Sequence, residues 1–168
     1  QTDKEAREVI EAYQASLTFA DRQLGRVLAK LDELKLRDRT VIVMFGDHGY
    51  HLGEKGKWSK HNSLFEVAAR VPLIVCLPGG EVGKSSPRTT QLLDIYPTLC
   101  EACGLPLPAG LEGHSLVRLG RDPQAAWEHP AYTVARNGPA FGQSVRTERY
   151  RYSQWTGGEG GAVLFDHE

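Results

Sequence analysis

A carboxylate, an imidazole and several amines are concentrated in the segment from residue 46 to residue 61. Asp47 and His48 are adjacent, with a glycine on each side, and a glycine-rich stretch then carries Lys55, Lys57, Lys60 and His61. An Asp-His pair is a suitable pair of ligands for a divalent cation, and lysines beside it favour an anion. We therefore expect this segment to act on a phosphate or sulfate ester.

The Asp47–His48 pair has two interpretations. One is metal binding, and the other is a turn in which Asp47 bonds its own backbone and His48 is exposed. Neighbouring side chains on a strand point to opposite faces, so they can share an ion only where the strand pattern breaks. Glycine on both sides permits such a break. Two protein ligands do not satisfy a hard cation, so further ligands must come from elsewhere.

The other polar residues are interpreted as structural, with the exception of Lys60. His51 and Glu54 could extend a metal site, but we interpret them as loop residues that shape the pocket. Lys60 lies between Trp58 and His61, and partial desolvation there would suit it to acid–base work. Two charged residues outside the segment are interpreted as structural: Arg70 in an ion pair, and Asp94 as a helix-capping carboxylate.

Composition limits the class of protein. The chain has 168 residues, a formal net charge of −1, 40% hydrophobic residues and 24% charged residues, which is typical of a globular domain with a core. Without a basic block it offers no electrostatic basis for a nucleic-acid partner. No apolar run has membrane-spanning length, and the N-terminal stretch predicts a polar helix rather than a signal peptide. The compartment is left open.

The first 104 residues are expected to form an α/β domain. Apolar residues spaced by three and four predict a long amphipathic helix over 3–36, and Thr2 with Glu5 predicts a capping box. Apolar runs at 40–45 and 71–77 predict two strands buried on both faces. A short helix over 64–70 would make the crossover between them, which favours a parallel sheet flanked by helices.

The later residues predict one more helix of the first domain and then a second unit. A helix over 91–103 should end at Gly104, and residues 104–130, rich in proline and glycine, should be extended. Short β-type runs at 131–135, 143–147, 150–152 and 163–165 predict a small antiparallel subdomain, so we divide the chain at residues 1–104 and 105–168. A chain that opens on a helix and stops just after a strand signal is expected to be part of a larger protein, and its open sheet edge favours self-association.

Motifs along nearly the whole chain resemble the sulfatase family of the alkaline-phosphatase superfamily, with most similarity to its iduronate-2-sulfatase and choline-sulfatase branch. The N-terminal helix and the segment that follows carry the first motifs: Tyr13-x-Ala15-Ser16, Asp21-x-x-x-Gly25-x-x-Leu28, Phe45-Gly46-Asp47-His48-Gly49 and Leu52-Gly53-Glu54-Lys55-Gly56. The later ones are Arg70-Val71-Pro72-Leu73-Ile74, Leu93-Asp94-Ile95-Tyr96-Pro97-Thr98-Leu99, Leu111-Glu112-Gly113-His114-Ser115-Leu116, Arg146-Thr147-Glu148-Arg149-Tyr150-Arg151-Tyr152 and Leu164-Phe165-Asp166.

The resemblance implies an alkaline-phosphatase-like fold and hydrolysis of a sulfated small molecule or saccharide. It implies that Asp47 and His48 bind a divalent cation, usually Ca²⁺, with Mg²⁺, Mn²⁺ or Zn²⁺ as alternatives, and that Lys60 contacts the sulfate. Counting forward from Asp47 gives Lys60 this position, whereas counting back from Arg70 gives it to His61; we favour Lys60 for its persistent charge. Members of the family are often exported or lysosomal.

The nucleophile that the resemblance implies is absent from these residues. The family uses a formylglycine made from a Cys or Ser followed by x-Pro-x-Arg, and no cysteine or serine here has that sequence after it. This chain thus resembles the C-terminal part of a sulfatase, and we expect it to need the missing N-terminal half for turnover. Three alternatives stay open: a phosphonate or phosphodiester hydrolase of the same superfamily, a non-catalytic domain, and a metal-binding module using Asp47, His48, His51 and Glu54.

Overall fold

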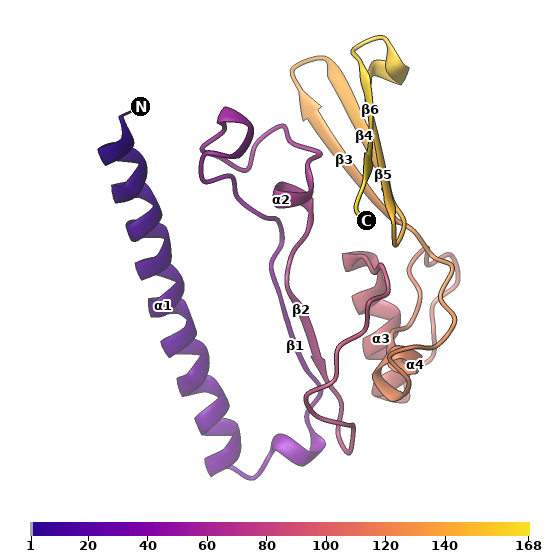
Figure 1. Ribbon diagram of the computed structural model, residues 1–168. Helices are drawn as coiled ribbons and strands as arrows, with labels where there is room; N and C mark the ends of the chain where they lie inside the picture. The colour runs from indigo at the N-terminus through magenta and orange to yellow at the C-terminus, as the bar shows by residue number, and fades with distance from the viewer. Residues whose placement is uncertain (1) are drawn as a thin grey trace.

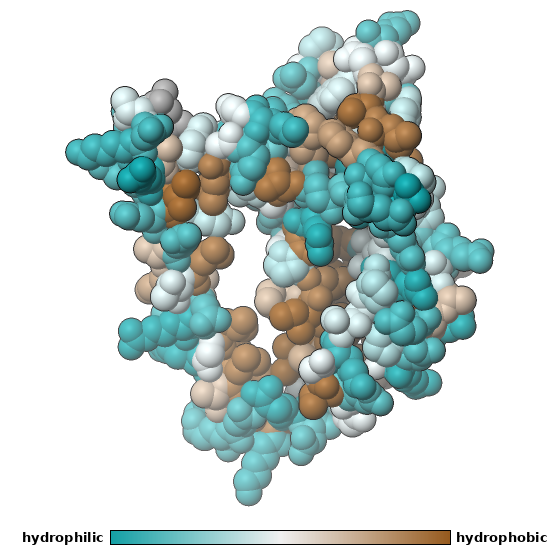
Figure 2. All heavy atoms as spheres, viewed as in Figure 1, coloured by the Kyte–Doolittle hydropathy of each residue, from teal (hydrophilic) through white to brown (hydrophobic). Residues whose placement is uncertain are grey.

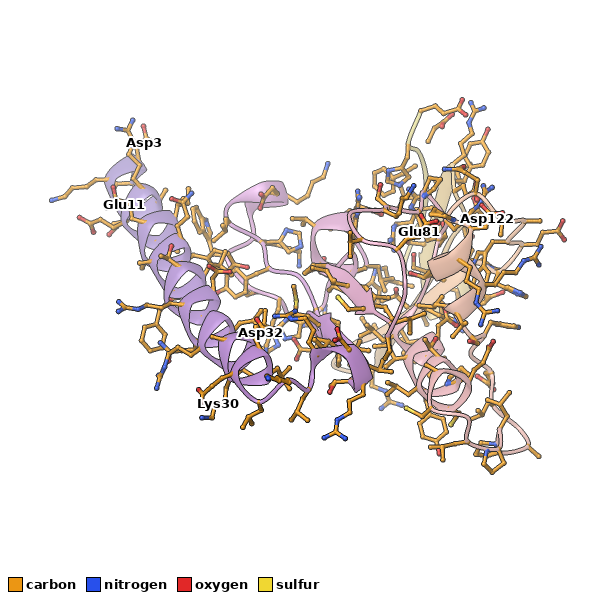
Figure 3. All side chains as sticks on the ribbon, turned by 90° about the horizontal axis from the view of Figure 1, so that it is seen from below. Asp3, Glu11, Lys30, Asp32, Glu81 and Asp122 are labelled. Atoms are coloured by element: carbon orange, nitrogen blue, oxygen red, sulfur yellow. The ribbon has the colours of Figure 1, made fainter. Side chains whose placement is uncertain are left out.

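The long N-terminal helix stands apart from the rest of the molecule. A computed structural model describes residues 2–168, and α1 runs over Asp3–Glu33 (Figure 1). The capping box is confirmed: Thr2 Oγ1 accepts from the Glu5 N–H at 3.3 Å, and Glu5 Oε2 accepts from the Thr2 N–H at 2.7 Å. None of the helical residues is buried. Asp3, Glu11, Lys30 and Asp32 are spread from its first turn to its last (Figure 3).

The two predicted strands of the first domain exist, but they pair in the opposite sense from the prediction. β1 is Ile42–Phe45 and β2 is Leu73–Cys76, and they are antiparallel, with Ile42 opposite Cys76 and Phe45 opposite Leu73. A parallel pair needs a crossover of a dozen or more residues, usually a helix. Residues 46–72 are numerous enough for one, but they form a loop and the single-turn helix α2 (Glu66–Ala69) beyond the end of β1, and the chain then returns along β1.

Neither strand is buried on both faces, which also differs from the prediction. Phe45 is 46% exposed and Ile74 is 50% exposed. One face of the pair is covered, because Leu73 and Val75 pack on the small core formed by Leu116, Leu119 and Ala125. The other face is left open because α1 does not pack over it, and Figure 2 shows an open gap between α1 and the strands.

Two helices follow β2. The predicted helix near residue 91 begins as a 3₁₀ turn at Leu92–Asp94 and continues as α3, Ile95–Ala102. Gly104 follows with φ +66°, a left-handed conformation that suits glycine at a helix C-terminus, as predicted. The second helix, α4 at Val117–Arg121, lies in the stretch predicted to be extended, and it contributes the buried Val117 and Leu119.

The C-terminal strands form the predicted antiparallel subdomain. β3 (Ala131–Asn137), β4 (Ala140–Arg146), β5 (Tyr150–Trp155) and β6 (Ala162–Asp166) pair in sequence order as a meander. Gly142 on β4 is required for packing, because an added Cβ would lie 2.7 Å from the Trp155 ring. β3 forms one edge of the sheet and faces the side of the molecule that carries α2 (Figure 1).

Across residues 2–168, no helix has both the length and the apolar character needed to cross a membrane.

Candidate functional site

Asp47 and His48 lie together immediately after β1. The ladder continues one residue beyond the strand, where the Gly46 N–H donates to the Pro72 carbonyl at 3.1 Å, and then it breaks. Beyond the break the two side chains turn to the same side, with 3.5 Å between His48 Nε2 and Asp47 Oδ2. Both line an open cleft of about 1320 Å³ that also contains Lys60 and His61. Thus the structure brings all four predicted site residues to one cleft.

The hydrogen bonds of His48 define which nitrogen is free. His48 Nδ1 lies 3.0 Å from the Gly49 carbonyl oxygen, which can only accept, so Nδ1 carries the proton in this contact. In the neutral ring Nε2 then presents a lone pair, and it faces a carboxylate oxygen of Asp47. Two electron-rich atoms facing each other suit a cation between them. A backbone carbonyl on Nδ1 with Nε2 free is also the usual arrangement of a metal-binding histidine.

Gly49 fixes the pair against α2. Its N–H donates to the Ala68 carbonyl at 2.8 Å, and a Cβ at Gly49 would lie 2.0 Å from the Val67 carbonyl oxygen. No side chain fits in that space. The backbone after His48 is therefore held directly on the end of the short helix.

His51 and Glu54 are loop residues, as predicted, but they brace the loop and neither lines the cleft. His51 is fully buried, with Nδ1 3.0 Å from the Glu54 carbonyl and Nε2 2.8 Å from Ser63 Oγ. The Glu54 carboxylate accepts from the Leu52 N–H at 2.6 Å, and backbone N–H groups of Glu54 and Leu52 lower the pKa of Glu54 below its ordinary value. Both ring nitrogens of His51 thus have hydrogen-bond partners in the loop.

The basic residues of the cleft are more exposed than the sequence suggested. Lys60 and His61 are both exposed, so the desolvation expected for Lys60 is not present. Arg70 was predicted to make a structural ion pair, but it is exposed and has no acidic side chain within 4.0 Å among residues 2–168. It follows directly after α2 and lines the same cleft as Lys60.

Asp94 has the structural role predicted for it. Its side chain is 1% exposed; Oδ2 accepts from the Gln91 N–H at 2.9 Å and Oδ1 from the His114 N–H at 2.8 Å. The carboxylate caps the start of the α3 region and ties it to the chain 20 residues later.

Sequence reasoning missed a cluster of largely buried charges in the wall of the cleft. Arg151, 4% exposed, donates from Nε to Glu66 Oε2 at 2.9 Å and also pairs through Nη2 at 2.8 Å, while Arg146 Nε lies 3.3 Å from the same oxygen. Burial alone would raise the pKa of Glu66, but the Arg151 hydrogen bond and the charges of Arg151, Arg146 and His167 outweigh it and lower that pKa. We call Glu66, Arg146 and Arg151 the clamp, because they join α2 to β4 and β5.

The donor set of the cleft fits part of a cation site. Asp47 offers carboxylate oxygen and His48 offers imidazole nitrogen, a pair that suits Mn²⁺ or Zn²⁺ and can take part in a Ca²⁺ site completed by oxygens. Within the described part of the chain, no group of three His, Cys, Asp or Glu residues is placed to hold a metal ion. The pair therefore needs further ligands to complete a site.

Known proteins resemble this chain over nearly all of its length. A family model described as Sulfatase matches residues 1–105. A sulfatase of Formosa agariphila is 39% identical over 155 residues, covering 92% of this chain and 30% of the relative, and the iduronate 2-sulfatase of Mus musculus is 27% identical, covering 90% and 38%. The solved structure of a 2-O GAG sulfatase superimposes with a TM-score of 0.89 at 26% identity, covering 98% of this chain and 37% of that one.

These likenesses confirm the sulfatase resemblance drawn from the motifs, and the superposition confirms the fold class. The chain spans only about a third of the length of the relatives it matches. From the match over residues 1–105 and the 39% identity to the Formosa agariphila protein, we conclude that this chain belongs to the sulfatase family of sulfuric ester hydrolases.

Proposed function

We propose that this chain supplies the cation-binding and sulfate-binding residues of a metal-dependent sulfatase. The observation that carries the proposal is the shared cleft, in which Asp47 and His48 stand side by side and Lys60 and His61 line the same space. A carboxylate and a free imidazole nitrogen suit a cation, and an unpaired ammonium group beside them suits an anionic ester. Family membership makes sulfate the preferred ester.

Each of these residues has a distinct role in the proposal. Asp47 and His48 would hold the cation, Ca²⁺ by preference, which when bound supplies positive charge next to the ester. Lys60 would balance the charge of the sulfate oxygens, and its exposure leaves it free to reach the ester. His61 or Lys60 would donate a proton to the leaving alcohol oxygen.

The nucleophile is proposed to lie outside these 168 residues. No cysteine or serine of the chain is followed by the x-Pro-x-Arg sequence that the family converts to formylglycine. The cleft residues would therefore bind and orient the ester, while the bond to sulfur forms at a residue of another part of the enzyme. The substrate class that we propose is a sulfated saccharide, because relatives include proteins named as an iduronate sulfatase and a GAG sulfatase.

A cation-dependence test in the intact enzyme addresses the proposal. Hydrolysis of 4-nitrophenyl sulfate should disappear with EDTA and return with Ca²⁺, and Asp47→Asn should lower kcat/KM by about 100-fold or more, the usual effect of removing a charged group at a reacting centre. The matched control is Asp38→Asn, since Asp38 is exposed and remote from the cleft.

Two results would contradict the proposal. Unchanged activity in Asp47→Asn would show that the carboxylate is incidental. Turnover of a phenylphosphonate ester with none of the sulfate ester would favour a phosphonate hydrolase of the same superfamily.

A further inference from the structure

The cleft contains more positive charge than its own acids neutralise. Three of its arginines have carboxylate partners: Arg88 Nη1 lies 2.8 Å from Glu148 Oε1, and the clamp pairs Arg146 and Arg151 with Glu66. These arginines are therefore structural. Glu148 balances Arg88, whereas Arg146 and Arg151 share the single negative charge of Glu66.

Three other basic side chains line the same cleft without such partners. Lys60, Arg70 and Arg136 have no acidic group within 4.0 Å anywhere in the chain from residue 2 onward. Lys60 and Arg70 belong to the wall formed by the loop and α2, next to Asp47 and His48. Arg136 belongs to the opposite wall, the edge strand β3. The unbalanced positive charge thus lies on both sides of the cleft.

A direct contact joins the two walls near Arg136. The Asn62 side-chain amide Nδ2 donates to Asn137 Oδ1 at 3.2 Å, so the end of β3 touches the loop just past Lys60 and His61. Arg136 precedes Asn137 by one residue. Its side chain lies on the other face of the strand from that of Asn137, so Arg136 lines the cleft at the end where the walls meet but does not itself make this contact.

The exposed face of β3 also offers an aromatic surface. Side chains two apart on a strand share a face, so Tyr132, Val134 and Arg136 form one row, and all three are exposed and line the cleft. Tyr132 is 65% exposed. At about 3.3 Å per residue, Tyr132 and Arg136 lie roughly 13 Å apart along the strand, a span longer than one sugar ring. A flat ring with a cation at this distance suits a saccharide of more than one unit.

We propose that Arg136 forms an anion subsite that binds a second sulfate or carboxylate group of a saccharide whose reacting sulfate ester lies at Lys60. The inference rests on the proposed function, which it deepens by naming the substrate class as a polyanionic saccharide. In this proposal β3 of the C-terminal subdomain determines which substrates are bound tightly. A simple aryl sulfate has no group for this subsite.

Binding by the intact enzyme after EDTA treatment tests the subsite without turnover. Isothermal titration should show that a disulfated disaccharide binds about ten-fold more tightly than its monosulfated counterpart, since a charge-assisted contact is worth that ratio. Arg136→Gln should remove the difference, and Arg136→Glu should reverse it. Arg118→Gln, at an exposed arginine of α4 outside the cleft, should keep it.

The difference in affinity should also shrink as NaCl is raised, because exposed charges are screened. Equal affinity of the wild-type enzyme for the two sugars, no binding of either, or a preference that persists in Arg136→Gln would each overturn the inference. Failure of the proposed function has another signature: the binding preference would be present, but the Ca²⁺-loaded enzyme would not hydrolyse the bound ester.

Discussion

At the scale of single residues, the site depends on how tightly the backbone is held next to His48. The Gly49 carbonyl orients the imidazole ring, and the Gly49 N–H is bonded to Ala68 of α2. Both contacts are made by the backbone of Gly49. The orientation of His48 Nε2 toward Asp47 thus depends on a backbone position where only glycine fits.

Replacement of Gly49 by Ala should destabilise the chain. The new Cβ would meet the Val67 carbonyl oxygen at 2.0 Å, so the loop and α2 must separate. Overpacking of this kind costs about 1–3 kcal/mol in the free energy of unfolding, measured by urea denaturation. Gly25→Ala is the matched control: no atom lies within 4 Å of a Cβ there, and Ala in place of Gly in a helix stabilises by up to about 1 kcal/mol. Equal effects of the two changes would contradict this account.

At the scale of elements, the clamp is what places the C-terminal sheet against the site. Glu66 is the first residue of α2, whose last turn bonds Gly49, while Arg146 and Arg151 come from β4 and β5. Arg151 Nη1 also donates to the Leu64 carbonyl and Ser144 Oγ, so its buried charge is fully surrounded by acceptors. The relative position of the two cleft walls therefore depends on this ion pair.

Glu66→Gln should be costly because it leaves Arg151 buried without its carboxylate. We expect a loss of about 2–3 kcal/mol in the free energy of unfolding, below the value for fully buried pairs because Glu66 is 29% exposed. Glu33→Gln removes an exposed ion pair with Lys30 and should change stability by no more than about 0.5 kcal/mol. Similar losses in both variants would argue against a special role for the clamp.

The stabilisation by Glu66 should depend on pH in a defined direction. The pKa of Glu66 is lower in the folded state than the ordinary value of 4.5, so folding favours its charged form. The contribution is then complete above pH 4.5 and is lost as the pH falls through the lower folded-state pKa. Denaturation curves of wild type and Glu66→Gln should converge in acid. A stability difference that stays constant down to pH 3 would contradict the assignment.

Local patterns predicted the elements well, whereas long-range contacts were not predictable from them. The three-four spacing and the Thr2–Glu5 pair define α1, and Gly104 marks the end of α3, because both signals are local in the chain. The antiparallel pairing of β1 and β2 depends on how residues 46–72 return, which no short pattern encodes. The site pair was visible in sequence, but the clamp joins residues 80 or more positions apart.

At the scale of the whole molecule, much apolar surface is left uncovered. Leu17 and Val27 on α1 are 54% and 60% exposed, and the main aromatic contact of α1 with the site loop is Tyr13 against Tyr50, with ring centroids 5.6 Å apart. The chain also spans about a third of its relatives' length. Self-association through this surface stays a prediction. The proposed cation site in the cleft is also incomplete, because Asp47 and His48 supply fewer ligands than a cation needs.

The chain by itself should therefore not hydrolyse sulfate esters. It lacks the x-Pro-x-Arg sequence after any cysteine or serine, and the two cation ligands that we propose, Asp47 and His48, are too few to complete a site. Incubation of the 168-residue chain with 4-nitrophenyl sulfate and Ca²⁺ should release 4-nitrophenol no faster than buffer does. Sustained release that Asp47→Asn abolishes would show that the nucleophile lies within these residues.

The most direct test of the central claim is to locate the cation. Crystals of the intact enzyme soaked in Mn²⁺ should show an anomalous difference peak bonded to both the Asp47 carboxylate and His48 Nε2, at about 2.0–2.3 Å from each. This peak should be absent from crystals of the Asp47→Asn variant. A well-occupied cation bonded elsewhere, with Asp47 and His48 making only protein hydrogen bonds, would contradict the account.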